Sequence, residues 1–247
     1  MEKISVIIVN WNVNAALQRC VRSVLATKYP NLELIIIDNN SEIKPPTATI
    51  QNKINLGFPK AVNQGLGKST GDYLLLLNPD TRLHKDFFDS AVQFIKAHPD
   101  IGVMGPKFTD PDGKNQGSVF HEPSIFGSNQ KYTPNSLEPI AVNAISGACM
   151  FIPRHTIEKV GMLTEEVFMY YEDMDYCRRI RKSGLKVYFN PQITIVHEHG
   201  SSAKINPLTS NWRGQLWKSS LWYNGPIKHY LMWLISWTSQ KFRQTFL

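Results

Sequence analysis

Two acidic positions in the chain stand where a carboxylate could do chemistry. Asp80 comes directly after the leucine-rich run 73–77, and Asp173 follows Glu172 after the apolar and aromatic run 167–171. A carboxylate at the end of a buried strand can hold a hard divalent cation such as Mg²⁺ or Mn²⁺. A carboxylate at a partly desolvated helix start can act as a general base. Both motifs also have ordinary structural interpretations, because Asn-Pro-Asp forms turns and acidic residues favour the first turn of a helix.

Two further residues allow both kinds of interpretation. Asp38 opens the sequence Asp-Asn-Asn-Ser, which is typical of an Asx turn, but its carboxylate could also accept from a nucleotide base or a ribose hydroxyl. His197 opens His-Glu-His, and residues two apart on a strand share a face, so a metal site is one interpretation. A single His at a strand end is usually structural. Asp175 is expected to pair with Arg178 or Arg179.

The segments that must position these residues alternate between strands and helices. Apolar runs predict the strands, and apolar residues at helical spacing predict the helices. We expect strands over residues 4–9, 32–37, 73–77, 186–189 and 194–196, and helices around 17–25, 60–66, 87–97 and 171–182. This alternation implies right-handed crossovers and a parallel sheet that binds ligands at the carboxyl ends of its strands. The first three ends carry Asn10 and Asn12, Asp38 to Ser41, and Asn78 with Asp80.

Residues 110–139 interrupt this pattern with proline, glycine, serine and asparagine and little periodicity. A loop of this length inside a compact domain is usually functional, so we interpret it as a lid or an acceptor-side insertion. Regular structure is expected to return from Ala141 to Ile152. The first half of the chain, before this segment, is predicted to form a nucleotide site.

Composition limits the class of protein. With 247 residues, 42% of them hydrophobic and 19% charged, the chain suits one large α/β domain and is not of disordered composition. Its net charge of +7 favours an anionic partner. Three scattered cysteines, Cys20, Cys149 and Cys177, argue against a disulfide framework or a zinc site and for a reducing cytosol. We expect no secretory signal and no membrane-spanning segment.

The C-terminal segment combines aromatic and basic residues. Five of the six tryptophans lie there, at Trp212, Trp217, Trp222, Trp233 and Trp237, with lysine and arginine residues between them. This combination is typical of helices at a bilayer interface, which is the interpretation we favour. Packing of the aromatic residues on the domain and stacking on single-stranded nucleic acid are the alternatives.

No glycine-rich phosphate loop follows the first expected strand. The G-x-G-x-x-G turn of dinucleotide-binding folds is absent, which argues against a dehydrogenase. The run Gly65 to Ser69 lacks the glycine spacing of a P-loop. A nucleotide diphosphate would have to be held in another way, for which a divalent metal ion is the obvious candidate.

Taken in order, these motifs resemble glycosyltransferase family 2, and within it the bacterial rhamnosyltransferase-like members. The resemblance extends from Ile4 to about Ser202. Its matching segments are Val6 to Asn12, Asp38 to Ser41, Asn55 to Gly65, Leu75 to Asp80, Ser146 to Met150, Glu172 to Arg178 and His197 to Ser202. Each segment alone is a weak signal, but the ordered set is specific.

The resemblance implies a GT-A fold, which is an α/β, Rossmann-like nucleotide-binding domain with a mixed, mainly parallel sheet flanked by helices. We expect this domain over residues 1–215, with a nucleotide-sugar-binding half at 1–105 and an acceptor-binding half at 106–215. Residues 216–247 would form a C-terminal amphipathic helical tail at the membrane interface.

The resemblance also assigns roles to particular residues. The donor site is expected at Val9, Asn10, Asn12, Asp38, Asn40, Asn55, Gly57, Phe58, Asn63, Asn78 and Asp80. Asp80 and His197 would bind the divalent metal, Mg²⁺ or Mn²⁺. Asp173 would be the catalytic base, and Gly147, Ala148 and Glu172 would bind the acceptor. Asn78 stands where the family's Asp-x-Asp motif has its first carboxylate, so we expect weak metal binding until the nucleotide arrives.

The expected activity is inverting transfer of a single sugar from a nucleoside-diphosphate sugar to a glycan or lipid-linked acceptor in bacterial cell-surface polysaccharide synthesis. The donor would be a dTDP-sugar such as dTDP-rhamnose, or a UDP-sugar. Single addition is expected because Gln240 to Gln244 lacks the tryptophan of the Gln-x-x-Arg-Trp motif of processive synthases.

We expect a cytoplasmic protein, peripheral at the inner face of the bacterial cytoplasmic membrane and without a nucleic-acid partner. A homodimer is one possible oligomeric state. Two other functions stay open. A sugar-phosphate nucleotidyltransferase would need a glycine-rich, arginine-containing loop after the first strand, where Trp11 to Asn14 stand instead. A non-catalytic carbohydrate-binding relative would bind the donor without forming product.

Overall fold

The computed structural model describes residues 1–125, 131–198 and 212–246, and its centre is a mixed β-sheet. The strands of the chain are β1 (Ile4–Asn10), β2 (Leu32–Asp38), β3 (Ile50–Gln51), β4 (Tyr73–Leu77), β5 (Thr81–Leu83), β6 (Ile101–Thr109), β7 (Asn115–Gln116), β8 (Val119–Phe120), β9 (Ile140–Ala141), β10 (Ala144–Ile145), β11 (Cys149–Pro153) and β12 (Lys186–His197). The helices are α1 (Asn14–Ala26), α2 (Phe58–Lys68), α3 (Phe87–Ala97), α4 (Arg154–Val160), α5 (Glu172–Lys182), α7 (Trp212–Asn224) and α8 (Pro226–Phe246).

The sheet has the order β3-β2-β1-β4-β11-β6-β12-β5, with β7 beside β6 and β9 beside β12. β3, β2, β1 and β4 pair in parallel, as do β6 and β12. β11 is antiparallel to both of its neighbours, β4 and β6. The expected α/β fold with a mixed sheet is therefore confirmed.

Helices cover both faces of the sheet because its central strands are apolar on both faces. In β1, Ile4, Val6 and Ile8 join one buried cluster with residues of α1 and α3. Ile7 points the other way and joins a second cluster with residues of α2 and α5. This two-residue alternation is the ordinary geometry of a strand, and it anchors β1 between two helical layers.

Close packing of α2 on the sheet depends on Gly65. A Cβ added there would lie 2.5 Å from Cγ2 of Ile7 and 2.9 Å from Cδ1 of Ile37. Only a residue without a side chain leaves room for the helix at this distance. The glycine in the middle of α2 is thus a packing residue of the fold.

The polar strand ends that the sequence predicts meet at one edge of the sheet. Asn10, the last residue of β1, pairs in register with Asp38, the last residue of β2. Because β11 is antiparallel to β4, with Cys149 opposite Leu77, the turn leading into β11 reaches the same edge. At the far side of the sheet, His197 at the end of β12 pairs with Thr81 of β5, next to Asp80.

The second half of the chain differs in detail from what the sequence predicts. The two late strands are one strand, β12, whose pairing with β6 shifts register between Asn190 and Thr194. The irregular segment 110–139 contains the short strands β7 and β8. Periodicity could not predict these two-residue strands, because they are too short to show any.

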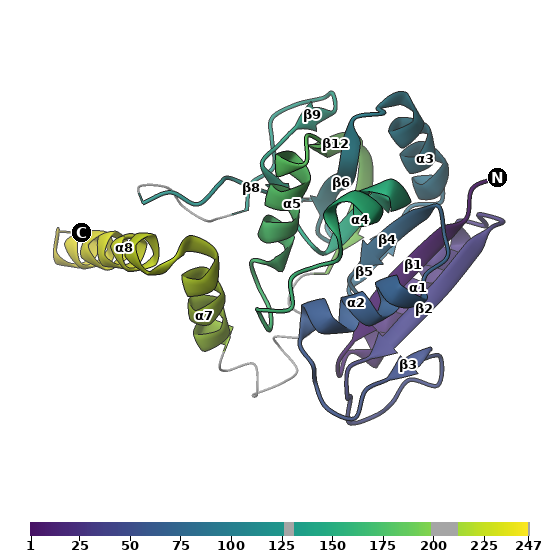
Figure 1. Ribbon diagram of the computed structural model, residues 1–247, viewed down its shortest axis with the longest axis horizontal. Coiled ribbons are helices and arrows are strands. Elements are labelled where there is room, and N and C mark those ends of the chain that lie inside the picture. The colour runs from purple at the N-terminus through teal and green to yellow at the C-terminus, as the bar shows by residue number, and fades with distance from the viewer. Residues whose placement is uncertain (126–130, 199–211, 247) are drawn as a thin grey trace.

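The C-terminal helices α7 and α8 project from one end of the domain, and the N-terminus lies at the opposite end (Figure 1). The boundary expected between residues 215 and 216 falls inside α7. In the described parts of the chain, no helix is both long and apolar enough to cross a membrane.

Candidate active site

The ends of β1 and β2 are joined by buried hydrogen bonds between side chains. The side-chain amide of Asn10 donates to Oδ1 of Asp38 at 3.1 Å and to the hydroxyl of Ser41 at 3.1 Å. Oδ2 of Asp38 accepts from the backbone N–H of Ser41 at 3.2 Å. The carboxylate therefore closes a local turn by a bond to the third residue along, whereas the expected Asx turn has its bond to the second. Its predicted role in donor binding stays a prediction, since each carboxylate oxygen can accept further bonds.

Two asparagines in this region have left-handed backbone conformations. Asn12 has a φ of 58° and Asn40 a φ of 69°. Asparagine tolerates this conformation better than most residues, so both tight turns are locally favourable. Asn12 Oδ1 accepts from the N–H of Glu42 at 2.8 Å, and Asn40 is exposed. The two turns shape the carboxyl edge of β1 and β2.

Asn39 ties the loop before α2 to the end of β2. Its side-chain amide donates to Asn55 Oδ1 at 2.8 Å and to the carbonyl of Gly57 at 3.2 Å. Its Oδ1 accepts from Asn52 Nδ2 at 3.0 Å and from the N–H of Leu56 at 3.1 Å. The donor residues predicted from the sequence do not include Asn39, although it lies in the Asp-Asn-Asn-Ser motif.

The remaining predicted donor residues have mainly structural contacts. Val9 is half-buried beside Ile37, and the N–H of Phe58 donates to the carbonyl of Phe168 at 2.8 Å. The side chain of Asn63 bonds the backbone of Leu163 through both of its polar atoms. These contacts fasten α2 to the segment that precedes α5. Whether the same residues also contact a donor stays a prediction.

Asp80 and His197 form a buried pair. Nε2 of His197 lies 3.5 Å from Oδ1 of Asp80, and the side chains are 6% and 10% exposed. The backbone supports this placement, because the N–H of Glu198 donates to the carbonyl of Asp80 at 2.8 Å. On the other side of the ring, Nδ1 of His197 lies 3.1 Å from Oε1 of Gln116. The motif's further residues, His199, Gly200 and Ser202, lie outside the described residues.

This pair fits a divalent metal ion. Two ligands on one octahedral ion, each about 2.1 Å from it, lie about 3 Å apart, which is close to the observed spacing. One carboxylate oxygen and one imidazole nitrogen suit Mn²⁺ better than Mg²⁺, which prefers oxygen. Within the described ranges, no group of three or more His, Cys, Asp or Glu side chains could hold a metal. The oxygens of a bound diphosphate would have to complete the coordination.

Asp173 is the second residue of α5 and is held by two backbone donors. Its Oδ2 accepts from the N–H of Gly147 at 3.0 Å, and its Oδ1 accepts from the N–H of Met174 at 2.8 Å. Ala148, the next residue, contacts the loop 78–80, which we call the metal loop. Its carbonyl accepts from the N–H of Asn78 at 2.9 Å. The turn 147–148 therefore connects the predicted base to the loop that carries Asp80.

Glu172 and Asp173 form a buried acidic pair. Burial raises the pKa of Glu172 to about 8, and the carboxylate of Asp173 adds to this shift. Burial also raises the pKa of Asp173, but the ammonium of Lys131 and the N–H of Gly147 oppose that rise. At neutral pH Glu172 therefore keeps its proton, and Asp173 is the member of the pair that ionises first. Oε2 of Glu172 has no hydrogen-bond partner among the described residues.

Lys131 provides positive charge near the Glu172–Asp173 pair. It lies in the irregular segment 110–139, where no hydrophobic periodicity indicated a site residue. Its Nζ donates to the hydroxyl of Ser146 at 3.0 Å and lies 5.3 Å from the centre of the Phe120 ring. Ser146 is buried and precedes Gly147 in the chain. The charge of Lys131 thus enters the site from the segment interpreted as a lid or acceptor-side insertion.

The segment before Asp173 has a strained backbone that α7 supports. Tyr170 and Tyr171 have φ values of 72° and 68°, which is unusual for aromatic residues. The hydroxyl of Ser219 donates to the carbonyl of Met169 at 2.7 Å, and the hydroxyl of Tyr171 donates to that of Ser220 at 3.3 Å. The helix α7 therefore belongs to the structure around the predicted base.

Asp175 has the structural role that the sequence predicts. Its two oxygens accept from Arg178 and Arg179, each at 2.8 Å. The sequence predicts one of these arginines as the partner, and both form ion pairs with Asp175. The charge of this carboxylate is consequently balanced within α5, so Asp175 is not a second candidate for the catalytic base.

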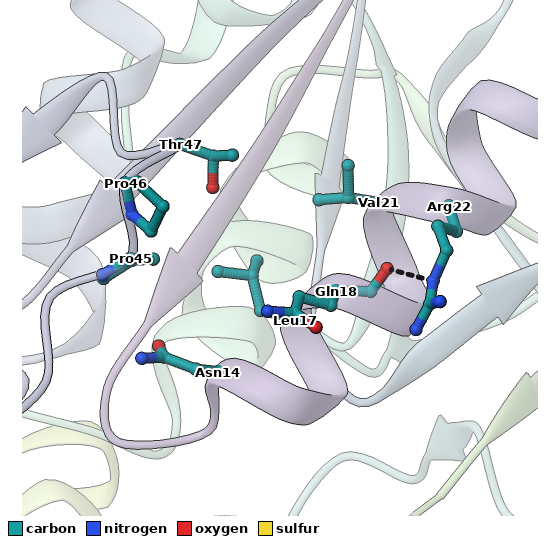
Figure 2. Close-up of a pocket in the computed structure, with 8 residues that line it drawn as sticks. All are labelled: Asn14, Leu17, Gln18, Val21, Arg22, Pro45, Pro46 and Thr47. Atoms are coloured by element: carbon teal, nitrogen blue, oxygen red, sulfur yellow. Dashed lines mark hydrogen bonds between the residues drawn. The ribbon is translucent and has the colours of Figure 1, made fainter.

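A hollow of about 310 Å³ lies outside this site, between α1 and the segment Pro45 to Thr47 (Figure 2). None of the predicted catalytic, donor, acceptor or metal residues lines it. Its walls include the apolar Leu17 and Val21 and the charged Arg22, whose Nε donates to the carbonyl of Gln18 at 3.2 Å. It therefore plays no part in the site described above.

Comparison with protein families identifies one match. The model described as "Glycosyl transferase family 2" matches residues 5–161, which is more than half of the chain. The matched range includes β1 to α4 and so contains Asp38, Asp80 and Gly147. It ends before Asp173.

Two curated proteins extend the similarity. An N-acetylglucosaminyl-diphospho-decaprenol L-rhamnosyltransferase of Mycobacterium tuberculosis is 27% identical over 240 residues, which cover 82% of this chain and 78% of that protein. The dTDP-rhamnosyl transferase RfbF of Shigella flexneri is 23% identical over 188 residues, which cover 71% of this chain and 63% of that protein. The rhamnosyltransferase-like resemblance is thereby confirmed.

A solved structure has the same fold. The crystal structure of GalNAc-T7 with UDP, GalNAc and Mn²⁺ matches with a TM-score of 0.64 at 19% identity. The match covers 80% of this chain and 43% of that chain, so this chain spans less than half of that protein's length. At this identity the likeness shows the fold alone, and it confirms the expected GT-A architecture.

Proposed function

This chain belongs to glycosyltransferase family 2 and is a glycosyltransferase, and we propose that it transfers one L-rhamnose residue from dTDP-L-rhamnose to a lipid-linked glycan, with inversion. Both curated relatives described above have rhamnosyl transfer in their names. The name of the mycobacterial relative also supports a polyprenyl-diphosphate-linked acceptor. A bacterial cell-surface polysaccharide is the product class that we propose.

One observation carries this proposal, which is the placement of Asp173. Its carboxylate is held by the turn 147–148, and the same turn bonds Asn78, two residues before Asp80. A base and a diphosphate-binding loop that share one turn would bring an acceptor hydroxyl and a donor sugar close to each other. Such an arrangement supports a direct displacement in which a single base assists.

In this reaction Asp173 accepts the proton of the acceptor hydroxyl. The hydroxyl oxygen forms a bond to the anomeric carbon while the bond from that carbon to the diphosphate oxygen breaks, and the diphosphate leaves with the electron pair. One displacement on the opposite face inverts the anomeric configuration. A divalent cation held by Asp80 and His197 would stabilise the negative charge on the leaving diphosphate. Gly147, Ala148 and the protonated Glu172 would face the acceptor.

We further propose that α8 rests on an anionic membrane surface at the inner face of the cytoplasmic membrane. Ile227, Tyr230, Leu231 and Leu234 follow an i, i+3, i+4, i+7 pattern along this helix and are exposed, from 42% at Leu231 to 79% at Ile227. Residues 199–247 contain six lysines or arginines and no aspartate or glutamate. An exposed apolar stripe in a basic segment suits the interface of an anionic bilayer. A lipid-linked acceptor would be reached from there.

The experiment that tests the proposed transfer uses the full chain with Mn²⁺, a synthetic polyprenyl-diphosphate-linked N-acetylglucosamine acceptor and a panel of nucleotide sugars. We expect dTDP-L-rhamnose to give product with release of dTDP, and the anomeric coupling constants of the product to show inversion. If a UDP-sugar gives product and dTDP-L-rhamnose gives none, the donor assignment is wrong. Donor binding without product for any acceptor in a set of lipid-linked glycans would favour a non-catalytic relative.

A further inference from the structure

Gln116 contacts His197 through both ends of its side-chain amide. Nε2 of Gln116 donates to the backbone carbonyl of His197 at 2.9 Å. Oε1 of Gln116 lies 3.1 Å from Nδ1 of the same histidine. Gln116 is not among the site residues predicted from the sequence. Its contact with Nδ1 bears on the protonation of the His197 ring.

The two contacts together determine which nitrogen of His197 carries the proton. A backbone carbonyl can only accept, so the amide of Gln116 must turn its nitrogen toward the carbonyl. Its oxygen then faces Nδ1, and an oxygen acceptor requires Nδ1 to be the protonated nitrogen. In the neutral ring the lone pair is consequently at Nε2, the nitrogen 3.5 Å from Oδ1 of Asp80.

The backbone of Gln116 is itself fixed. Gln116 lies in β7, where it pairs with Phe108 of β6, and its carbonyl accepts from the hydroxyl of Thr133 at 2.8 Å. Phe108 also packs on the imidazole of His197, with 5.3 Å between the ring centres. The amide thus projects from a sheet strand beside the ring, which limits the rotation of the imidazole.

We propose that Gln116 is a positioning residue of the metal site, which fixes His197 in the Nδ1–H tautomer and presents Nε2 toward the ion that Asp80 shares. The inference rests on the proposed function for the presence of the metal. Partners of this kind orient a metal-binding histidine, and their loss typically lowers metal affinity about 10–100-fold.

Three variants of the full chain separate the possible roles of the side chain. Gln116→Met preserves the approximate length and removes both polar contacts. Gln116→Glu keeps an oxygen acceptor for the Nδ1 proton, but it turns a carboxylate oxygen instead of an N–H toward the carbonyl of His197. Gln192→Met makes the same glutamine substitution on β12, where the side chain donates to Glu138 at 3.0 Å and lies outside the site.

The first measurement is Mn²⁺ affinity, by electron paramagnetic resonance titration in the presence of dTDP and, separately, of UDP. We expect Gln116→Met to bind Mn²⁺ about 10–100-fold more weakly than the wild type. Gln116→Glu should retain the wild-type affinity within about threefold or exceed it, because the acceptor that sets the tautomer remains. Gln192→Met should match the wild type.

The second measurement needs no metal and reports the tautomer directly. Long-range ¹H–¹⁵N NMR of metal-free protein labelled with ¹⁵N-histidine, with His197 assigned from the spectrum of His197→Gln, should show the Nδ1–H form in the wild type. Gln116→Met should shift His197 toward the Nε2–H form. An Nε2–H tautomer in the wild type would overturn the proposal even if Gln116→Met fails to fold.

The remaining outcomes distinguish this inference from the proposed function. If the wild type binds Mn²⁺ with nucleotide and Gln116→Met binds it equally well, Gln116 has no positioning role while the proposed metal site stands. If the wild type binds no Mn²⁺ with either nucleotide, both the metal site and the role of Gln116 are wrong.

Discussion

The backbone N–H of Gly147 lies 3.0 Å from Oδ2 of Asp173 and donates a hydrogen bond to it. Gly147 approaches closely, since a Cβ added there would lie 3.4 Å from the Cβ of Asp173. The neighbouring Ala148 accepts from Asn78 at the start of the metal loop. The predicted base and the predicted leaving-group site are therefore held by adjacent residues of one turn, and displacement of that turn would move both.

Asp80 should be required for metal binding. Asp80→Asn replaces the carboxylate with a weaker, neutral ligand, so we expect Mn²⁺ affinity in the presence of dTDP to fall further than the roughly 10–100-fold typical of losing an outer partner. A chelator should abolish transfer by the wild type, and added Mn²⁺ should restore it. Asp112→Asn, in an exposed turn, is the matched control. Undiminished activity in the chelator would show that the site works without a metal.

Asn39 should control the shape of the donor loop. Asn39→Ala removes four hydrogen bonds to the loop 52–57 and leaves buried polar groups without partners. We expect the free energy of unfolding to fall by about 1–3 kcal/mol and the KM for the nucleotide sugar to rise. Urea denaturation and donor kinetics measure the two effects. Asn135→Ala, at an exposed asparagine, should change neither, and an unaltered KM in Asn39→Ala would show that the loop does not shape the donor site.

Glu172 should make stability depend on pH. The unfolded side chain loses its proton near the ordinary pKa of 4.5, whereas the folded one keeps it up to about 8. Between these values the native state binds more protons, so its stability falls as pH rises, by up to about 1.4 kcal/mol per pH unit from this group. Glu172→Gln removes this dependence.

We therefore expect the stability of Glu172→Gln relative to the wild type to increase from pH 5 to pH 8 in chemical denaturation. Below about pH 4.5 the two proteins should differ by a constant amount. Glu158→Gln, at an exposed glutamate, should track the wild type throughout. A difference between Glu172→Gln and the wild type that stays constant from pH 5 to pH 8 would mean that Glu172 ionises normally in the folded protein.

The exposed stripe of α8 should bind anionic vesicles. The double variant Leu231→Asn with Leu234→Asn removes two apolar side chains from it, and we expect binding to vesicles rich in phosphatidylglycerol to weaken about tenfold or more. Co-sedimentation measures the effect. Ile54→Asn with Leu137→Asn, at two exposed apolar residues away from α8, is the control and should bind like the wild type. Equal binding by the two double variants would place the membrane contact elsewhere.

Much of the fold could be predicted because each buried strand is a continuous run of apolar residues in the sequence. The apolar runs before Asn10, Asp38 and Asn78 form β1, β2 and β4, and their polar ends meet at one edge of the sheet, as parallel pairing requires. The pairing of Asp175 with two arginines was predictable for a similar reason, because i+3 and i+4 neighbours on a helix are close. Local spacing was sufficient for all of these features.

The rest depends on contacts between distant segments. Gln116 reaches His197 only because the two-residue strand β7 pairs with β6, and no periodic pattern marks so short an element. Lys131 enters the acidic site through an irregular segment, and Ser219 supports Met169 from a helix fifty residues later in the chain. β12 pairs with β6 on both sides of its shift in register at Asn190 to Thr194, so it is one strand where the sequence predicts two.

Replacement of Asp173 by asparagine tests the central claim most directly. Asparagine has nearly the same shape and one oxygen that can accept from Gly147 or from Met174, but not from both, and it cannot take the proton of the acceptor hydroxyl. We predict that Asp173→Asn lowers the rate of sugar transfer about 10²–10⁴-fold, while calorimetry with dTDP and Mn²⁺ gives a dissociation constant within about threefold of the wild type. Transfer at the wild-type rate by a correctly folded Asp173→Asn would contradict the assignment of Asp173 as the base.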